Sequence, residues 1–388
     1  MKQFYNSSNK FIQKHLLKIP PKNNRNILLD LVKPHLKNNA DVLDPYTRTG
    51  EFIKDINKFD ISLNIYGIEE DEYIFDTFCD ISNSTIYNTN FLTLSSQHNL
   101  LSYDLIFGSP PSFIIDKNTQ YGKMFKLWTR DKTDIYSLYI LRAIDLLKDG
   151  GILAFIVPDT ILNSPTTQLL RNRIHSNGSV LSIKRLSNLF TKTNYNTVSF
   201  VFQKFIQNDN KYIFNVSNHV FFSLDTPLYK RIFNNCTFFS LLNVHIQKGH
   251  VNYNSIRSNN SKTFPIIYTK NITDNSISLY NNSKQYISIK HCDFKLFNKP
   301  SLIISKGYGC KKNEHSLNYS LCTLEKYTTH ENMFVITFPN LDNESAIIKI
   351  SSIVTSLNNE QTKNWCKQFL HNGIITLFQI KHYLPLFL

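Results

Sequence analysis

Residues 104–113 read Asp-Leu-Ile-Phe-Gly-Ser-Pro-Pro-Ser-Phe. In this segment an apolar strand pattern leads into a small polar residue, which two prolines follow. Because proline fixes φ and lacks an N–H donor, carbonyl groups in such a loop can face a substrate instead of joining a helix. In a parallel α/β sheet this loop would follow the carboxyl end of a strand, where such folds bind ligands. Ser109, Pro110 and Pro111 can then surround an amino group with acceptor oxygens. A Pro-Pro turn after a buried strand explains the stretch equally well when it is taken alone.

The elements around this loop alternate between strand and helix patterns up to residue 205, which predicts a doubly wound α/β sheet. The expected strands are 41–43, 62–68, 84–87, 103–107, 152–157, 180–184 and 197–202. The expected helices are 26–33, a segment ending near 81, 134–147 and 168–174. Beyond residue 207 the strand patterns become short and irregular, and helical periodicity returns only at 351–369. We therefore expect a catalytic domain at 1–205, a linker at 206–214 and a second, α+β domain at 215–388.

The formal net charge is +14, and its excess lies in the second part of the chain. Residues 1–205 carry 24 Lys and Arg against 19 Asp and Glu, whereas residues 206–388 carry 19 against 10. A basic domain beside a more balanced one favours a polyanionic partner, nucleic acid first. A Lys- and Asn-rich coding bias is the alternative explanation of the charge.

The overall composition narrows the class of protein. Hydrophobic residues make up 41% of the chain, which indicates a globular protein. No run of about twenty apolar residues and no signal-peptide core is present, so we expect a cytoplasmic protein without membrane contact. The six cysteines include no Cys-x-x-Cys pair, and no metal site is expected.

The Ser109 loop resembles motif IV of the amino-methyltransferases that modify adenine N6 or cytosine N4 in DNA. In that motif Asn, Asp or Ser precedes Pro-Pro and an aromatic residue, whereas Ser112 stands at the aromatic position here. Further segments resemble other motifs of the same enzymes, in the order X, I, II, III, IV, V, VI and VIII. They lie at 2–7, 41–53, 65–69, 90–92, 109–112, 134–139, 146–158 and 190–200. This order is that of the γ group, the TaqI-like enzymes with a C-terminal target-recognition domain.

This resemblance implies S-adenosylmethionine as the cofactor. Gly50 matches the second glycine of motif I, while Arg48 occupies the position of the first. Glu69 would accept hydrogen bonds from the ribose hydroxyls, although an acidic cap of the following helix is the alternative. The carbonyl oxygen of Asn90 would face the adenine amino group of the cofactor. The residues expected at the cofactor are Phe4, Tyr5, Asn6, Asp44, Pro45, Gly50, Glu69, Asn90 and Ser109.

The same resemblance implies that the target base leaves the duplex and lies near motif IV. The Ser109 side chain and the Pro110 carbonyl would accept the two amino hydrogens, and the nitrogen would attack the sulfonium methyl group. Phe113 and Phe190 are the expected stacking partners of the base. The motif order favours adenine N6, whereas Ser109 is more typical of cytosine N4. The expected catalytic residues are Ser109, Pro110, Pro111, Phe113 and Phe190.

The expected partner is double-stranded DNA, bound by a monomer, with a restriction endonuclease or a regulatory protein as a further partner. Two alternatives stay open. Arg48, Asn90 and Ser112 depart from the motifs, which favours a catalytically inactive, DNA-binding relative. The second alternative is a methyltransferase acting on RNA or on protein glutamine. Protein-glutamine enzymes also use an Asn-Pro-Pro-Tyr-like loop, but they usually lack a long basic recognition domain.

Overall fold

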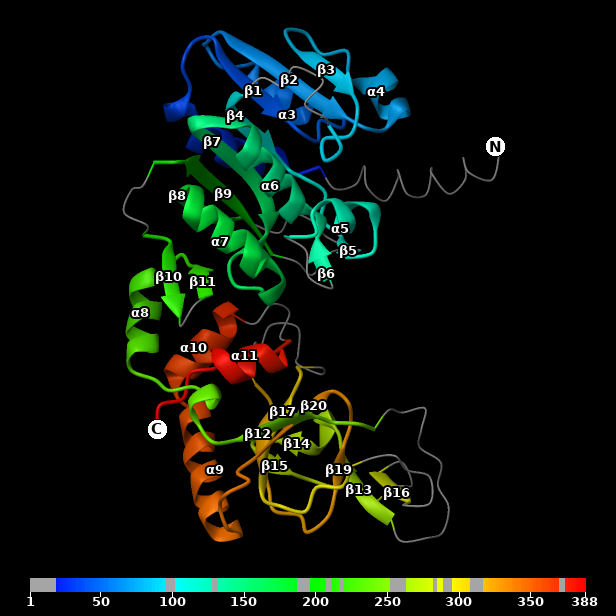
Figure 1. The fold of residues 1–388 in the computed structure, drawn as a ribbon, viewed down its shortest axis with the longest axis vertical. Coiled ribbons are helices and arrows are strands. Elements are labelled where there is room, and N and C mark those ends of the chain that lie inside the picture. Colours follow the sequence, from blue (N-terminus) through cyan, green and yellow to red (C-terminus); the bar gives the residue numbers. More distant parts are fainter. Residues whose placement is uncertain are drawn as a thin grey trace, which may run out of the picture. The chain divides into compact units, whose positions relative to one another are not determined.

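The computed structural model divides into two compact units, Met1–Tyr229 and Lys230–Leu388 (Figure 1). Each unit is described by itself. The structure describes residues 19–94, 102–127, 132–186, 196–206, 211–216, 219–251, 263–281, 285–288, 295–307, 317–369 and 374–388.

A seven-stranded mixed sheet forms the centre of the first unit, in the order β3-β2-β1-β4-β7-β9-β8. The strands are β1 (Ala40–Asp44), β2 (Leu63–Glu69), β3 (Thr85–Asn88), β4 (Tyr103–Gly108), β7 (Leu147–Pro158), β8 (Gly178–Leu186) and β9 (Thr197–Lys204). Along the sheet, the neighbouring strands β3, β2, β1, β4 and β7 pair in parallel, whereas β9 runs antiparallel to both β7 and β8. The strand order reverses between β1 and β4, so the loops after these two strands lie where doubly wound sheets bind ligands.

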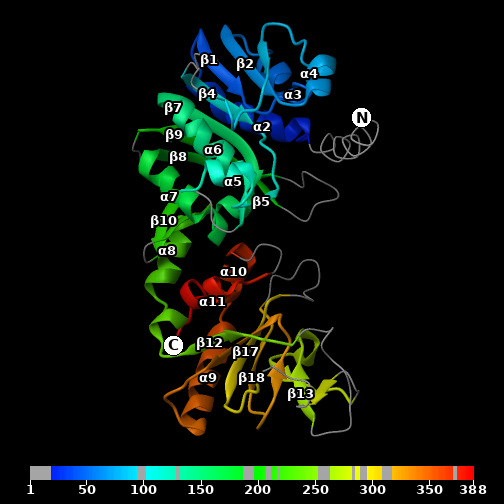
Figure 2. The ribbon, with the colours of Figure 1, turned by 45° about the vertical axis from the view of Figure 1, so that its right-hand side comes forward.

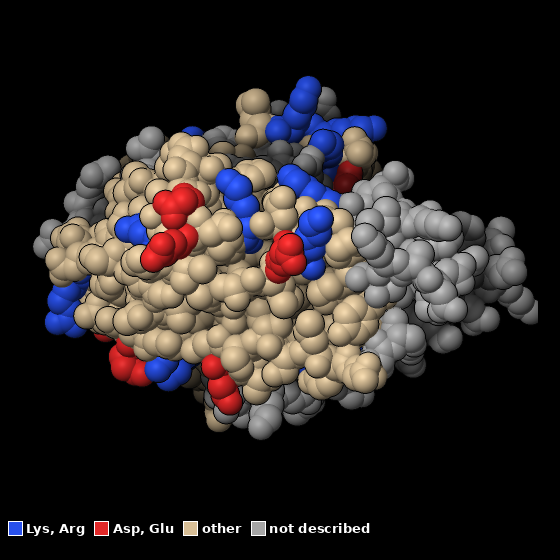
Figure 3. All heavy atoms as spheres, turned by 90° about the horizontal axis from the view of Figure 1, so that it is seen from below, with Lys and Arg blue, Asp and Glu red and all other residues tan. Residues whose placement is uncertain are grey.

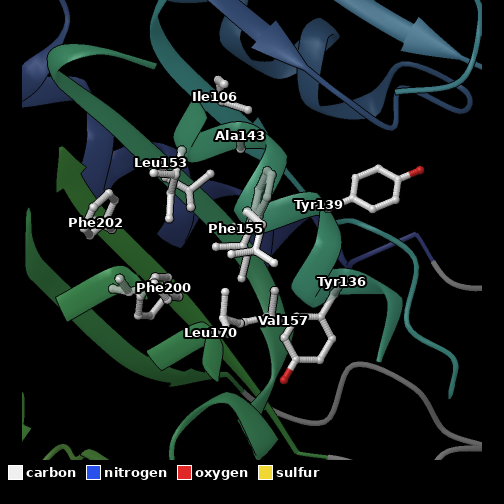
Figure 4. Packing of buried hydrophobic residues seen from close by; sticks show 14 of the residues in the cluster. Ile106, Tyr136, Tyr139, Ala143, Leu153, Phe155, Val157, Leu170, Phe200 and Phe202 are labelled. Atoms are coloured by element: carbon white, nitrogen blue, oxygen red, sulfur yellow. The ribbon is translucent and has the colours of Figure 1, made fainter. Parts of the chain in front are cut away.

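Helices cover both faces of this sheet (Figure 2). They are α2 (Lys22–Val32), α3 (Glu51–Ile56), α4 (Glu72–Phe78), α5 (Gln120–Met124), α6 (Ile135–Leu146) and α7 (Gln168–Asn177), with short 3-10 turns at Lys33–His35, Asp159–Ile161 and Pro165–Thr167. Ile106 and Leu153 pack with α6 and α7 on one face, as Figure 4 shows for part of the cluster. Their neighbours Leu105 and Ile152 pack with α2 and α3 on the other face. Burial on both faces explains why these strands are continuous apolar runs in the sequence.

Two hairpins extend the first unit beyond its sheet. Strand β5 (Ile114–Asp116) pairs with β6 (Lys132–Asp134), directly after the Ser109 loop. Strand β10 (Ile213–Val216) pairs with β11 (His219–Phe222).

The β10–β11 hairpin packs against the helices that cover the sheet of the first unit. Ile213 and Phe222 join the cluster around α6 and α7, and Arg171 Nε donates a hydrogen bond of 2.6 Å to Val220 O. The expected linker 206–214 thus contains residues of the first unit's core, and the two units divide later, within α8 (Thr226–Asn234).

The second unit combines small sheets with helices. A four-stranded antiparallel sheet has the order β12-β20-β17-β18, and a three-stranded sheet the order β16-β13-β19. The strands are β12 (His245–Lys248), β13 (Thr263–Ile267), β14 (Ile272–Thr273), β15 (Ser276–Ile277), β16 (Tyr286–Ser288), β17 (Ser301–Ser305), β18 (Tyr319–Cys322), β19 (Thr328–Thr329) and β20 (Met333–Thr337). The helices that lie wholly in this unit are α9 (Asn343–Leu357), α10 (Glu360–Phe369) and α11 (Leu377–His382), with 3-10 turns at Phe239–Leu241 and Thr269–Asn271.

The expected fold class, a doubly wound α/β sheet followed by an α+β unit, is confirmed. Two details of the expectation are wrong. Helix α8 lies in the segment where helical periodicity was expected to be absent, and the expected helical element at 351–369 consists of α9 and α10. Asp342 caps the start of α9 by accepting a hydrogen bond from Ser345 N, which sets the true beginning of that helix. None of the described helices combines the length and apolar character that crossing a membrane requires.

Candidate active site

The loops after β1 and β4 line one cavity, which has an empty volume of about 280 Å³ including space open to solvent. The loop after β1 contributes four consecutive residues, and Ser109 contributes from the loop after β4. Two residues of α3 and two residues at the start of the described chain complete the lining. The lining residues are Ile19, Pro20, Tyr46, Thr47, Arg48, Thr49, Glu51, Phe52 and Ser109. The segments that resemble motifs I and IV therefore meet in space.

The turn between β1 and α3 requires a glycine at position 50. Gly50 has φ +75°, and a Cβ atom there would lie 2.0 Å from Ile81 Cδ1. Gly50 N donates to Thr47 O at 2.9 Å, and Thr47 N donates to Ile68 O at 2.9 Å, which fixes the loop against β2. The close neighbour of Gly50 is thus a core side chain, so packing alone already explains the glycine.

Asp44 is fully buried at the end of β1, beside the buried Pro45. Its Oδ1 accepts a hydrogen bond of 3.1 Å from Tyr46 N, while Oδ2 has no hydrogen-bond partner among the described residues. Burial raises the pKa of the Asp44 carboxyl from 3.8 to about 7, with a smaller contribution in the same direction from the nearby Glu69. A buried carboxylate with one unsatisfied oxygen is suited to a cationic ligand group.

Glu69 joins the loop after β1 to the loop after β2. Its Oε2 accepts a hydrogen bond of 2.7 Å from Arg48 N, and its Oε1 accepts one of 2.8 Å from Asp71 N. The residue is 2% exposed, and burial raises the pKa of its carboxyl. Since each carboxylate oxygen has a second lone pair, hydrogen bonds from ribose hydroxyls remain compatible with this arrangement.

The side chain of Asn90 makes other hydrogen bonds than the sequence predicts. Its carbonyl oxygen accepts hydrogen bonds from Leu92 N at 2.9 Å and Thr93 N at 3.2 Å. Its amide nitrogen donates to Glu70 and, at 2.8 Å, to Tyr121 Oη. The oxygen expected to face the adenine amino group therefore caps its own turn instead.

The Ser109 loop is fixed by two side-chain hydrogen bonds. Ser109 Oγ donates to Ile156 O on β7 at 3.3 Å, and Ser112 Oγ donates to Asp134 Oδ2 at 2.9 Å. Pro110 is buried, and Pro111 is partly buried. The Ser109 hydroxyl hydrogen is engaged with Ile156, so its oxygen lone pairs remain free to accept a hydrogen bond.

Phe113 is 40% exposed at the start of the β5–β6 hairpin. Its carbonyl accepts a hydrogen bond of 3.0 Å from Ile135 N, which anchors the backbone while the ring remains accessible. The other residues expected at the site, Phe4, Tyr5, Asn6 and Phe190, lie outside the described residues.

Two contributors to the site were not among the expected site residues. Asp134 caps α6 through Tyr136 N and also holds Ser112, and an acidic residue before an apolar helical run is the signal that could have identified it. Tyr121 binds Asn90 from 31 positions away, which no local pattern predicts. Among the described residues, no group of three or more His, Cys, Asp or Glu side chains could hold a metal ion.

Comparison with known proteins finds similarity to Type II methyltransferases and to methylases of restriction-modification systems. Residues 24–190, less than half of the chain, match the family model described as Eco57I restriction-modification methylase. The Type II methyltransferase M.CvrRI of Paramecium bursaria Chlorella virus XZ-6E is 26% identical over 363 residues, which are 90% of this chain and 88% of that protein. The Type II methyltransferase M.HincII of Haemophilus influenzae is 27% identical over 189 residues, 46% of this chain and 36% of that protein. Among solved structures, the type IIG restriction endonuclease BpuSI is similar with a TM-score of 0.45 and 12% identity, over 93% of this chain and 57% of that one.

The strand order of the sheet and the cavity at its β1–β4 switch point are those of the class I methyltransferase fold, whose cofactor is S-adenosylmethionine. More particularly, the chain is similar to methylases of restriction-modification systems, which confirms its resemblance to the DNA amino-methyltransferases. The γ arrangement of the motifs stays a prediction.

Two buried carboxylates next to the loop after β1 have the chemistry that this cofactor requires, and neither is among the residues that line the cavity. Asp44 offers a buried, unsatisfied carboxylate oxygen to a cationic group, and Glu69 offers free lone pairs to hydroxyls. Bound there, S-adenosylmethionine would supply an electrophilic methyl group.

Proposed function

We propose that this protein transfers the methyl group of S-adenosylmethionine to an exocyclic amino nitrogen of a base in duplex DNA. The observation that carries the proposal is the position of Ser109. It lines the same cavity as the loop after β1, so an amino group held at Ser109 would lie next to the cofactor's methyl end. The similarity to restriction-modification methylases supports DNA as the substrate.

The protein's contribution to this reaction is positioning. Ser109 Oγ and the Pro110 carbonyl would accept the two hydrogens of the amino group and thereby direct its nitrogen toward the methyl carbon. The hydrogen bond from Ser109 to Ile156 O and the anchoring of Ser112 by Asp134 keep the acceptors in place. Such pre-orientation can supply much of the acceleration of a two-substrate reaction.

Adenine N6 is the favoured target, with cytosine N4 as the second candidate. The motif order along the chain favours adenine, whereas the serine at position 109 favours cytosine. A target base inside a duplex is accessible only after flipping, which costs a few kcal/mol, and an exposed Phe113 offers a stacking surface.

The second unit is the proposed target-recognition domain, and a monomer is the proposed DNA-bound form. The basic excess of residues 206–388 supports this assignment through its attraction to phosphates. On the face drawn in Figure 3, Lys and Arg side chains are interspersed with Asp and Glu over a mostly uncharged surface. That face therefore offers no continuous basic stripe among its described residues. A restriction endonuclease remains the proposed biological partner.

The test is to incubate the full-length protein with methyl-labelled S-adenosylmethionine and unmethylated duplex DNA of mixed sequence, and then to identify the labelled nucleoside. We expect N6-methyladenine, and N4-methylcytosine would reassign the target base. A Ser109→Ala variant is expected to bind the cofactor normally and to transfer methyl groups far more slowly. Label transferred to RNA or to a glutamine peptide but not to DNA would refute the proposal. Absence of label from a folded, DNA-bound protein would favour the inactive relative.

A further inference from the structure

Arg48 is a buried cation that forms no ion pair with any carboxylate of the described residues. The residue is 8% exposed and lines the cavity shared with Ser109. Its guanidinium lies 5.4 Å from the centre of the Tyr46 ring, and its Nε has no hydrogen-bond partner among the described residues. A buried guanidinium normally satisfies its donors with carboxylates or carbonyls, so an unsatisfied one facing a cavity points to a ligand anion.

The neighbouring acidic groups are already engaged elsewhere. Glu51 also lines the cavity, but its carboxylate lies 3.5 Å from Arg25 and 3.8 Å from Lys54. Glu69 accepts its hydrogen bond from the backbone N–H of Arg48, and the Arg48 guanidinium acts on this carboxyl without a hydrogen bond, by lowering its pKa. Asp44 accepts its one hydrogen bond from Tyr46 N. Among the described residues, none of these carboxylates forms an ion pair with the Arg48 guanidinium.

The cavity and the loop that borders it therefore present both charges that a zwitterion requires. Arg48 lines the cavity and forms no ion pair among the described residues, while the buried Asp44, two positions before the first lining residue of the same loop, has an unsatisfied carboxylate oxygen. The amino-acid end of S-adenosylmethionine carries one carboxylate and one ammonium group, which match these two side chains in sign. A guanidinium also binds a carboxylate through two parallel hydrogen bonds, which a lysine cannot reproduce.

We propose that Arg48 binds the carboxylate of the cofactor's amino-acid end. This inference rests on the proposed function, because it requires S-adenosylmethionine in the cavity. In the resemblance to motif I, Arg48 stands at the position of the first glycine, and its φ of +54° is a conformation that glycine adopts freely. The substitution thus keeps the glycine-like turn and adds a ligand-binding side chain.

The backbone conformation provides a clean variant. Arg48→Gly removes the guanidinium and relieves the positive φ, so the loop should keep its shape. Arg48→Lys keeps the charge but loses the planar fork. Arg173→Ala is the matched control, since Arg173 lies in the same unit and pairs with Asp145 at 3.3 Å, away from the cavity.

The measurement is equilibrium binding by calorimetry, with S-adenosylhomocysteine and 5′-methylthioadenosine as the two probes. Both contain the adenosine part, but only S-adenosylhomocysteine contains the amino-acid end. We expect Arg48→Gly to weaken S-adenosylhomocysteine binding by about 10- to 100-fold, the range for a hydrogen bond to a charged group, and to leave 5′-methylthioadenosine binding unchanged. Arg48→Lys should lie between wild type and Arg48→Gly, and Arg173→Ala should bind both probes like the wild type.

Each other outcome overturns a different statement. If Arg48→Gly binds both probes like the wild type, or weakens both equally, Arg48 does not bind the carboxylate. If Arg48→Gly leaves S-adenosylhomocysteine affinity intact but weakens binding to duplex DNA, the guanidinium binds a phosphate and the inference is wrong. If the wild type binds neither probe, the cofactor of the proposed function is refuted and the inference with it.

Discussion

The carboxylate of Asp44 lies directly against the backbone of Gly108. A Cβ atom at Gly108 would lie 2.7 Å from Asp44 Oδ1, which is closer than real Cβ contacts allow. Asp44 ends β1 and Gly108 ends β4, and the two strands are neighbours in the sheet. A side chain at position 108 would therefore press against Asp44 and push apart the ends of β1 and β4, from which the two loops of the site begin.

Gly108→Ala should therefore damage both stability and methyl transfer. Gly108 has φ +138°, so an alanine would be strained in its backbone as well as pressed against Asp44. Gly150→Ala is the matched control, because Gly150 also has a positive φ of +79° but its nearest contact, Ile206 Cδ1, is 3.6 Å away. Urea unfolding should show a loss of about 1–2 kcal/mol for Gly150→Ala. Gly108→Ala should lose about 1–3 kcal/mol more, the typical cost of overpacking. Equal losses would mean that the Asp44 contact relaxes without cost.

Much of the first unit was predictable because its strands are buried on both faces. The apolar runs at 103–107 and 152–157 predict strands that β4 and β7 confirm, and the polar stop after each run locates the loop edge of the sheet. The β5–β6 hairpin could not be predicted in the same way. Each of its strands has three residues, and their pairing joins positions separated by a helix.

The site was predictable to the extent that it depends on strand ends. Asp44 and Ser109 follow adjacent parallel strands, so their proximity follows from the fold. The bonding of Asn90 does not, since it depends on a turn within its own segment and on Tyr121. Arg48 is visible in the sequence as a departure from a motif, but its burial and missing partner are properties of the folded loop.

The buried Asp44 should make stability and ligand binding depend on pH. The folded protein holds this proton with a pKa of about 7, against 3.8 for an exposed aspartate, so the unfolding free energy falls as pH rises between these values. Glu69, whose pKa burial also raises, acts in the same direction. Asp44→Asn should flatten the pH dependence of the unfolding free energy over this window. If the unfolding free energy of Asp44→Asn still depends on pH as strongly as that of the wild type, Asp44 is not the titrating group.

Cofactor binding should have the opposite dependence on pH. A cationic ligand group favours the ionised carboxylate, so the affinity for S-adenosylhomocysteine should increase from pH 6 to pH 8 as Asp44 loses its proton. Calorimetric titrations at several pH values test this, and Asp44→Asn should both weaken binding and remove the increase. An affinity that falls with pH would exclude an ionised Asp44 from the ligand site.

Removing the Glu69 carboxylate should loosen two loops at once. Glu69→Ala leaves the buried N–H groups of Arg48 and Asp71 without their acceptor, which costs about 1–3 kcal/mol of unfolding free energy. The same change should weaken S-adenosylhomocysteine binding, since the ribose hydroxyls lose their acceptor. Glu72→Ala, at an exposed position in the first turn of α4, is the control and should alter neither quantity. Lower stability with unchanged affinity would give Glu69 a structural role only.

Phe113 provides a test of base stacking that leaves the fold intact. Its side chain is 40% exposed, so Phe113→Ala should change the unfolding free energy by no more than about 0.5 kcal/mol. If the ring stacks on the flipped base, its loss removes about 1–3 kcal/mol of binding, and kcat/KM for DNA should fall at least about fivefold. Cofactor affinity should stay unchanged, because the ring is not among the residues that line the cavity.

The neighbouring Ile114 supplies the control for this experiment. Ile114 is 58% exposed on the same hairpin, so Ile114→Ala removes a similar apolar surface one position further from Ser109. A loss of kcat/KM in Phe113→Ala alone would assign Phe113 to the target base. Equal losses in both variants would instead indicate a general DNA contact of the hairpin. Wild-type kinetics in Phe113→Ala would show that Phe113 does not replace the aromatic residue of motif IV, whose position Ser112 occupies.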